Sequence, residues 1–181
     1  MKKRFEPLKD LIGTNTPIQV RRKGIDEHSL DGFVVGLSEK LLLLHVINGD
    51  DLLLNGYSAI RIQDITSWKI DEGFVTCAMR HYGREPVVPT QIDCDNWSVL
   101  LASGQKAYTF VSIETARNES GCCFIGPITK QKSRSITLRH ATSKAVWGDE
   151  EKFRLRDITK VDLDNGYVNA LIEVMREERL V

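Results

Sequence analysis

Two stretches of this chain repeat one another at a fixed offset. Arg61–Val75 reads RIQDITSWKIDEGFV and Arg154–Val168 reads RLRDITKVDLDNGYV, so the second begins 93 residues after the first and aligns without a gap. Arg, Asp, Ile, Thr, Asp, Gly and Val coincide, whereas unrelated segments of this length share about one identity. Because a repeat constrains the architecture more than any local pattern does, the sequence predicts a tandem duplication of one small domain.

The repeat extends upstream as a set of short strands. Ile18–Val20 falls on Val111–Ile113 at the same offset, and both segments alternate apolar and polar residues. Asn48-Gly49 is a hairpin signal, because both residues tolerate positive φ. Short strands separated by turn signals are typical of a small barrel or sandwich. We therefore expect each copy to contain a helix, five strands and a closing helix.

The closing helices are predicted from apolar residues at helical spacing. Each follows an aspartate, Asp71 or Asp164, which we expect to cap the helix by accepting backbone N–H groups. The predicted apolar stripes are Phe74, Cys77, Ala78 and Tyr82 in copy one, and Tyr167, Ala170, Leu171, Val174 and Met175 in copy two.

A proline-containing segment separates the two copies. Arg84–Thr90 includes Pro86 and Pro89, which favour a stiff, extended connector. We predict a first domain over residues 1–85, a linker over 86–92 and a second domain over 93–181.

Two motifs in each copy resemble those of Sm-like proteins, which are small, bent five-stranded barrels preceded by a helix. Leu30–Ser38 followed by Leu41–Leu44 is similar to their first motif, and Ala59–Ile65 to their second. Phe153–Ile158 stands at the second-motif position of copy two. The resemblance implies a mainly β fold with short helices, namely two tandem Sm-like five-stranded barrels, each preceded and followed by a helix. The pattern also resembles that of bacterial proteins of about this length.

The resemblance extends to function only in part. Sm-like proteins commonly bind single-stranded RNA in rings, through an Asp and an Asn of the first motif and an Arg-Gly of the second. In this chain Ser38, Leu42 and Ile62 replace the Asp, Asn and Gly, and only Arg61 and Arg154 keep their type. Since an aliphatic side chain cannot hydrogen-bond a base edge, we expect the usual uracil pocket to be lost.

Composition narrows the function classes. Lys plus Arg and Asp plus Glu both number 25, so the chain lacks the basic excess typical of nucleic-acid binders. Neither an export signal nor a long apolar run is evident, which indicates a cytoplasmic protein without membrane segments. We expect the four cysteines to be reduced thiols rather than metal ligands. Known catalytic and cofactor motifs are not found, so we expect no catalytic residues, cofactor or metal.

The remaining candidates form an interaction surface. Arg61, Arg154 and Arg156 come from the repeated motif, and Trp147 stands in an apparent exposed turn, where it could be a contact hot spot. Loop or strand-end charges complete the set: Arg21, Arg22, Lys130, Lys132 and Arg134.

These features favour a non-enzymatic binding module that contacts a protein partner. The first alternative is an RNA-binding Sm-like protein, because of Arg61, Arg154 and the basic loops. The second is an immunity protein or antitoxin that inhibits a cognate enzyme. Pairing between the two copies would leave a monomer or a homodimer.

Overall fold

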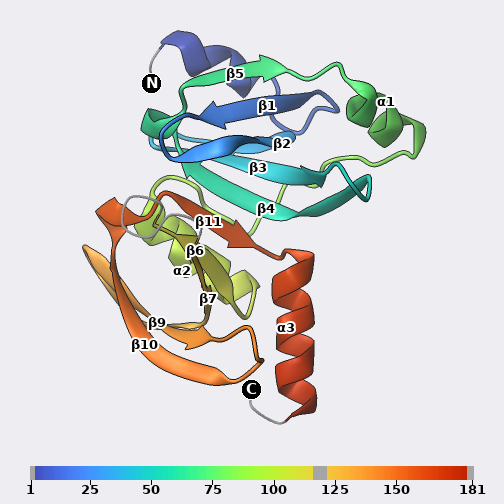
Figure 1. The fold of residues 1–181 in the computed structure, drawn as a ribbon. Helices are drawn as coiled ribbons and strands as arrows, with labels where there is room; N and C mark the ends of the chain where they lie inside the picture. Colours follow the sequence, from blue (N-terminus) through green and yellow to red (C-terminus); the bar gives the residue numbers. More distant parts are fainter. Residues whose placement is uncertain (1–2, 116–121, 179–181) are drawn as a thin grey trace.

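Strands dominate the chain, as the predicted class of mainly β with short helices requires. A computed structural model describes residues 3–115 and 122–178, which Figure 1 shows as a ribbon. In chain order the elements are η1 (Lys3–Lys9), β1 (Pro17–Arg22), β2 (Asp26–Leu37), β3 (Leu41–Asn48), β4 (Leu53–Arg61), η2 (Ile62–Asp64), β5 (Ser67–Ile70), α1 (Phe74–His81), α2 (Trp97–Ala107), β6 (Val111–Glu114), β7 (Cys123–Gly126), β8 (Ile128–Lys132), β9 (Ser135–Ala141), β10 (Trp147–Arg154), η3 (Leu155–Asp157), β11 (Lys160–Leu163) and α3 (Gly166–Glu177).

The strands form two antiparallel sheets. One has eight strands in the order β5-β1-β2-β3-β4-β11-β6-β7, and the other has three in the order β10-β9-β8. In place of two separate five-stranded barrels, the described strands are therefore arranged as two open sheets. Helices or 3-10 turns precede and follow each set of strands, at η1 and α1 and again at α2 and α3.

Strand β11 joins the two halves of the chain, which we define as residues 3–81 and 97–178. It pairs with β6 of its own half on one side and with β4 of the first half on the other. Lys160 lies opposite Ile60 and Leu163 opposite Tyr57 in the pairing with β4. The eight-stranded sheet is therefore continuous across both halves (Figure 1).

A Gly-Pro step separates β7 from β8. The φ of Gly126 is 157°, and a Cβ at this position would lie 1.9 Å from the carbonyl oxygen of Arg139, so only glycine fits. Pro127 has no N–H to continue a ladder, but its carbonyl accepts from the Arg139 amide at 3.0 Å. Consequently β7 pairs with β6 in the large sheet, while β8 pairs with β9 in the small one.

The leucine run of β3 explains why the halves share a core. Leu42 and Leu44 pack in a cluster with η1, β1 and β2, whereas Leu41 and Leu43 pack in a second cluster with α2 and strands of the second half. Four consecutive apolar residues suit a strand that is buried on both faces. Side chains from both halves thus build the larger core.

The predicted apolar stripes of the closing helices are confirmed only in part. Ala78, Leu171 and Met175 are buried as predicted, but Phe74 is 78% exposed and Tyr167 is 60% exposed. Met79 in α1 and Val168 and Ile172 in α3 complete the buried faces. The cap predictions are also wrong. Asn165 caps α3 by accepting from the Val168 amide, and Gly73 occupies the N-cap of α1, where Asp71 accepts from the Gly73 amide and the Thr76 hydroxyl.

Among the described helices, none is both long enough and apolar enough to cross a membrane. The predicted connector Arg84–Thr90 runs between α1 and α2 without regular secondary structure.

Candidate functional site

Three adjoining hollows form the candidate site. Two of them are lined by residues of the second half of the chain alone, and the third lies where the two halves meet. The junction pocket, about 410 Å³, is lined by residues of both halves, including Lys40, Arg61, Gln63, Trp97 and Arg156. It shares Ser133, Leu155 and Arg156 with a middle hollow of about 550 Å³, which also contains Arg134, Lys152 and Arg154. The middle hollow shares Ser135 and Lys152 with a small hollow of about 140 Å³ beside Lys130 and Lys132. We call the three together the basic groove.

The groove concentrates one sign of charge. The lining of these three hollows contains a single acidic side chain, Glu39, against eight basic ones: Lys40, Arg61, Lys130, Lys132, Arg134, Lys152, Arg154 and Arg156. A fourth hollow shares Lys152 and Arg154 with the middle one and adds the acidic side chains of Glu151 and Asp157. The whole chain carries 25 basic and 25 acidic residues, so this is a local accumulation within a neutral protein. Clustered positive charge in a hollow attracts an anionic ligand and raises its local concentration.

Arg61 is held rigidly at the head of the groove. It ends β4, and its side chain is only 9% exposed. Its Nε donates to Asp64 of η2, and its Nη1 donates to the carbonyl oxygen of Arg156 at 2.7 Å. Arg61 and Asp64 can meet because the short 3-10 helix η2 directly follows β4 and brings Asp64 close to the last residue of that strand. Arg61 therefore links the repeated motif of one half to that of the other.

Two buried donors at the junction pocket have no hydrogen-bond partner among the described residues. One is Nη2 of Arg61 and the other is the indole Nε1 of Trp97, and both side chains line this pocket. A buried donor left unsatisfied costs about 1–3 kcal/mol.

The predicted surface residues divide into two sets. Six of them line the basic groove: Arg61, Lys130, Lys132, Arg134, Arg154 and Arg156. Arg21 is exposed on β1 and is not part of the groove lining. Trp147 begins β10 instead of standing in an exposed turn, and it is half-buried between the Phe110 ring at 5.8 Å and the Arg139 guanidinium at 4.3 Å.

The structure contradicts the predicted surface position of Arg22. It is 2% exposed, so it is neither a solvated loop charge nor a contact for an outside ligand. Its Nη1 donates to the Thr159 carbonyl at 3.2 Å, and its Nη2 lies 3.2 Å from the Asp26 carboxylate. Burial of a charge requires such partners, and here they tie β1 of the first half to the strand that joins the halves.

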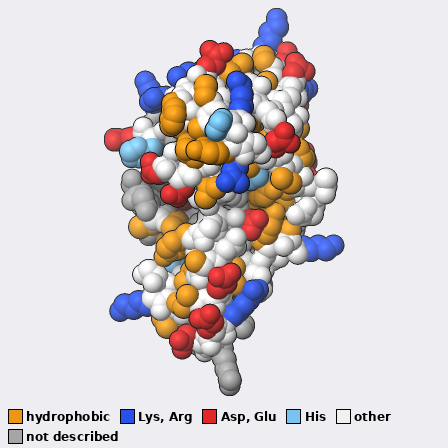
Figure 2. Space-filling view, turned by 90° about the vertical axis from the view of Figure 1, so that its right-hand side faces the viewer, with side chains coloured by type: hydrophobic (Ala, Val, Ile, Leu, Met, Phe, Trp, Pro, Cys, Tyr) orange, Lys and Arg blue, Asp and Glu red, His pale blue; other side chains and the backbone are white. Residues whose placement is uncertain are grey.

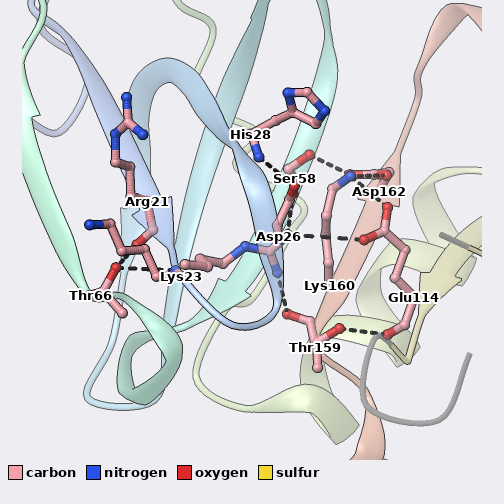
Figure 3. A network of polar contacts seen from close by, with 11 residues as sticks. Arg21, Lys23, Asp26, His28, Ser58, Thr66, Glu114, Thr159, Lys160 and Asp162 are labelled. Carbon is pink, nitrogen blue, oxygen red and sulfur yellow. Dashed lines mark hydrogen bonds and ion pairs between the residues drawn. The ribbon is translucent and has the colours of Figure 1, made fainter. Parts of the chain in front are cut away.

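Arg22 belongs to a polar network at the junction of the halves. Figure 3 shows other members of this network, among them Glu114, Lys160 and Asp162. Lys160 Nζ lies 2.8 Å from Glu114 and 3.0 Å from Asp162, and Ser58 donates to Asp162 across the β4–β11 pairing. Burial by itself would lower the pKa of Lys160, but the two carboxylates raise it above its usual value. Burial raises the pKa of Asp162, with Lys160 and Ser58 partly offsetting the effect. The partners satisfy one another, which makes this network a structural joint.

Three residues of the groove were not predicted from the sequence. Lys40 stands in the turn before β3, Lys152 lies on β10, and Trp97 begins α2. Trp97 is 7% exposed and belongs to the larger core. Only the assembled fold brings these positions beside Arg61, because each is far from it in the chain.

Within the described segments, no group of three or more His, Cys, Asp or Glu side chains is placed to hold a metal ion. The four cysteines are free thiols, and burial is the main cause that raises the pKa of Cys94 and of Cys123.

Comparison with known proteins adds no relative: no family model matches the chain, and neither a curated protein nor a solved structure matches it.

Proposed function

We propose that this protein is a non-enzymatic binding module for single-stranded RNA, built from two Sm-like units in tandem. One observation carries the proposal: eight basic side chains and one acidic side chain line three adjoining hollows in a chain of zero net charge. Phosphate neutralisation supplies most of the affinity in such complexes, so a local accumulation of this size favours RNA over the protein partner that the neutral composition suggested.

Recurring hydrogen bonds support the duplication on which this proposal rests. The amide and hydroxyl of Thr66 both donate to the carbonyl of Arg21, and those of Thr159 both donate to the carbonyl of Glu114. Strand pairing recurs as well. The first half runs β5-β1-β2-β3-β4, and the second runs β11-β6-β7 and then β8-β9-β10 across the Gly-Pro step. Each half thus has the strand order of one bent five-stranded unit.

The groove offers an RNA strand contacts with its phosphates. The exposed basic groups would contact phosphates along the length of the strand. Trp97 is buried in the core, so it offers no face for base stacking. Binding is therefore dominated by charge. If all seven exposed basic residues of the groove neutralised a phosphate, the slope of log K against log salt would reach about −5.

Fluorescence anisotropy with a labelled, unstructured RNA at increasing salt tests the proposal. We expect salt-sensitive binding that weakens at least about tenfold in Arg154→Glu/Arg156→Glu, because two attractive contacts become repulsive. The matched control is Arg80→Glu/Arg84→Glu, which changes two exposed arginines of α1 and the connector outside the groove. Binding that is absent at low salt, or that weakens equally in both variants, contradicts the proposal.

A protein partner remains the second candidate because of a different surface. Figure 2 shows the face that carries α1 and α3, where hydrophobic side chains lie among charges of both signs. Three of the exposed aromatics belong to or adjoin these helices: Phe74, Tyr82 and Tyr167. Exposed aromatics are enriched at protein interfaces. A protein captured by the wild-type chain and lost with Phe74→Asp/Tyr167→Asp, but retained with Arg154→Glu/Arg156→Glu, would support this candidate.

A further inference from the structure

The three-stranded sheet carries a regular array of basic side chains on one face. In this sheet β9 lies between β8 and β10 and pairs antiparallel with both. Residues directly opposite each other on paired strands have their side chains on the same face of the sheet. The register therefore determines which side chains of the three strands share a face.

Two rows of side chains on this face have the same composition. In each row a hydroxyl-bearing residue of β9 lies between a basic residue of β8 and a basic residue of β10. The first row consists of Lys130, Thr137 and Lys152, and the second of Lys132, Ser135 and Arg154. The four basic residues are exposed and the two hydroxyl-bearing residues are half-buried. A hydroxyl group with a cation on each side suits a phosphate, which accepts hydrogen bonds and carries negative charge.

The other face of the same strands is part of the core. Ile136 and Phe153 lie opposite each other there, and both are buried. Leu138, also buried, lies opposite Glu151, so the acidic side chain of the fourth hollow starts from the face opposite to the rows. Because the sheet is packed from behind, the basic residues of both rows start from fixed backbone positions.

The positive array ends on one side and continues on the other. Arg139 follows Thr137 by two residues and shares its face, but it lies directly opposite Glu150, so the charges at that end are balanced. Beyond the second row, Arg134 lies in the turn between β8 and β9 and lines the middle hollow together with Arg156. The array therefore leads from the small hollow toward the junction of the two halves.

The spacing of the rows matches the repeat of an extended nucleic-acid strand. Residues two apart on a β-strand are separated by about 7 Å, close to the distance between successive phosphates of an extended single strand. Neighbouring β-strands lie about 5 Å apart, so the cations of one row start about 10 Å apart and can both reach a phosphate above the hydroxyl group. One hollow of about 140 Å³ spans both rows and is lined by Lys130, Lys132, Ser135, Thr137 and Lys152.

The rows suit phosphates rather than bases. Recognition of bases in a single strand uses aromatic stacking or hydrogen bonds to the base edges. Both rows consist of cations and hydroxyl groups, and Trp97, the one aromatic residue among the described residues that line the three hollows, is 7% exposed. A nucleic-acid strand held by its phosphates on the rows would leave its bases toward solvent.

We propose that the exposed face of β8, β9 and β10 binds a single nucleic-acid strand through its phosphates, with successive phosphates on successive rows. Sequence is then not read, and DNA binds as well as RNA because neither row requires the 2′-hydroxyl group. This inference deepens the proposed function and rests on it, since it names the class of ligand and its path across the groove. The nucleic-acid strand follows β9 from the first row to the second and continues past Arg134.

Fluorescence anisotropy with three labelled oligonucleotides of equal length tests which parts of the ligand are recognised. The probes are oligo(U), oligo(dT) and a DNA strand whose sugars carry no bases. We expect their affinities for the wild-type chain to agree within about threefold at equal salt, because all three present the same series of phosphates.

Substitutions within the rows test the position of the phosphates. Lys130→Gln/Lys152→Gln removes the cations of the first row, and Lys132→Gln/Arg154→Gln removes those of the second. Each variant should reduce the magnitude of the slope of log K against log salt by about 1.4, because two phosphate contacts are lost. Each should also weaken the binding of all three probes at low salt by at least about tenfold.

The matched control is Lys106→Gln/Lys144→Gln, which removes two exposed ammonium groups of the second half outside the groove. It should change neither the slope nor the affinity, and unchanged melting temperatures will show that the row variants remain folded.

The outcomes separate this inference from the proposed function. If oligo(U) binds but the base-free strand or oligo(dT) binds more than about tenfold more weakly, bases or sugars are recognised and the inference is overturned, whereas RNA binding stands. Row variants that bind oligo(U) like the control would also overturn the inference alone. If none of the three probes binds at low salt, both the inference and the proposed function fail.

Discussion

Replacing Lys160 by methionine should destabilise the junction between the halves by about 3 kcal/mol. Its ammonium group lies 2.8 Å from Glu114 and 3.0 Å from Asp162, and only 16% of its side chain is exposed. Breaking a buried pair by removing one partner costs about 3–5 kcal/mol, because the remaining charge is uncompensated. Glu114 is 27% exposed and gains some solvation, which places the cost at the lower end.

The measurement is the free energy of unfolding in urea, together with the melting temperature. For a chain of this size, about 3 kcal/mol corresponds to a fall of about 6–12 °C. Lys106→Met is the matched control, because it removes an exposed ammonium group of α2 and should change stability by less than about 0.5 kcal/mol.

The deficit should also depend on pH. Burial already raises the pKa of Asp162, and the loss of Lys160 removes a charge that lowers it. Protonation of Asp162 then favours the folded state, so stability is regained as the pH falls through the raised pKa. The reasoning is refuted if Lys160→Met costs no more than Lys106→Met, or if its deficit stays constant on acidification.

Two further perturbations probe the same assembly. His45 is buried, which lowers its pKa from the ordinary value of 6.5, and its Nδ1 accepts from the Val87 amide at 3.1 Å. The unfolded chain therefore binds more protons than the folded chain. Because of this difference, the free energy of unfolding should fall as the pH drops below about 6.5. Urea titrations from pH 8 to 5 should show this loss in the wild type and not in His45→Gln. Gly56→Ala should cost at least about 2 kcal/mol by the same assay, because Gly56 has φ +67° and a Cβ there would lie 2.4 Å from the Leu163 carbonyl oxygen. Gly24→Ala is the control, because Gly24 has φ +84° but no atom lies within 4 Å of the position of its added Cβ. An equal loss of stability in both variants would show that backbone strain, and not the contact with the Leu163 carbonyl, causes the loss.

Local patterns predicted the strands well because alternation and turn residues act over a few neighbours. The leucine run Leu41–Leu44 lies in β3, and a turn begins at Gly49, directly after the last residue of that strand. The pairing of β11 with both β4 and β6 could not be predicted, because the local sequence of a strand does not indicate which distant strand it pairs with, and β4 lies about a hundred residues away.

The predicted buried stripes of the closing helices were only partly right for a related reason. The spacing of apolar residues allowed two neighbouring faces, and the surrounding strands selected the one with Met79 and Val168, which left Phe74 and Tyr167 exposed.

The candidate site followed from the sequence where a repeated motif or a basic run marked it. Arg61 and Arg154 were found because they recur at the fixed offset. Arg22 was wrongly placed at the surface, because a charged residue in a basic run is normally solvated and its buried partners come from distant strands. No sequence motif marks Lys40, Lys152 or Trp97, and only the folded structure brings them to the site.

The position of β11 has a consequence for synthesis of the chain. Strand β4 is complete at Arg61, but the strand that covers its edge begins at Lys160. At about 5–20 residues per second, a ribosome needs about 5–20 s to make the intervening segment. During that interval the nascent first half exposes both an unpaired strand edge and the Leu41 and Leu43 face of its core. The time when this protein is most prone to aggregate is therefore set by translation speed, and slow translation between these strands would lengthen its dependence on chaperones.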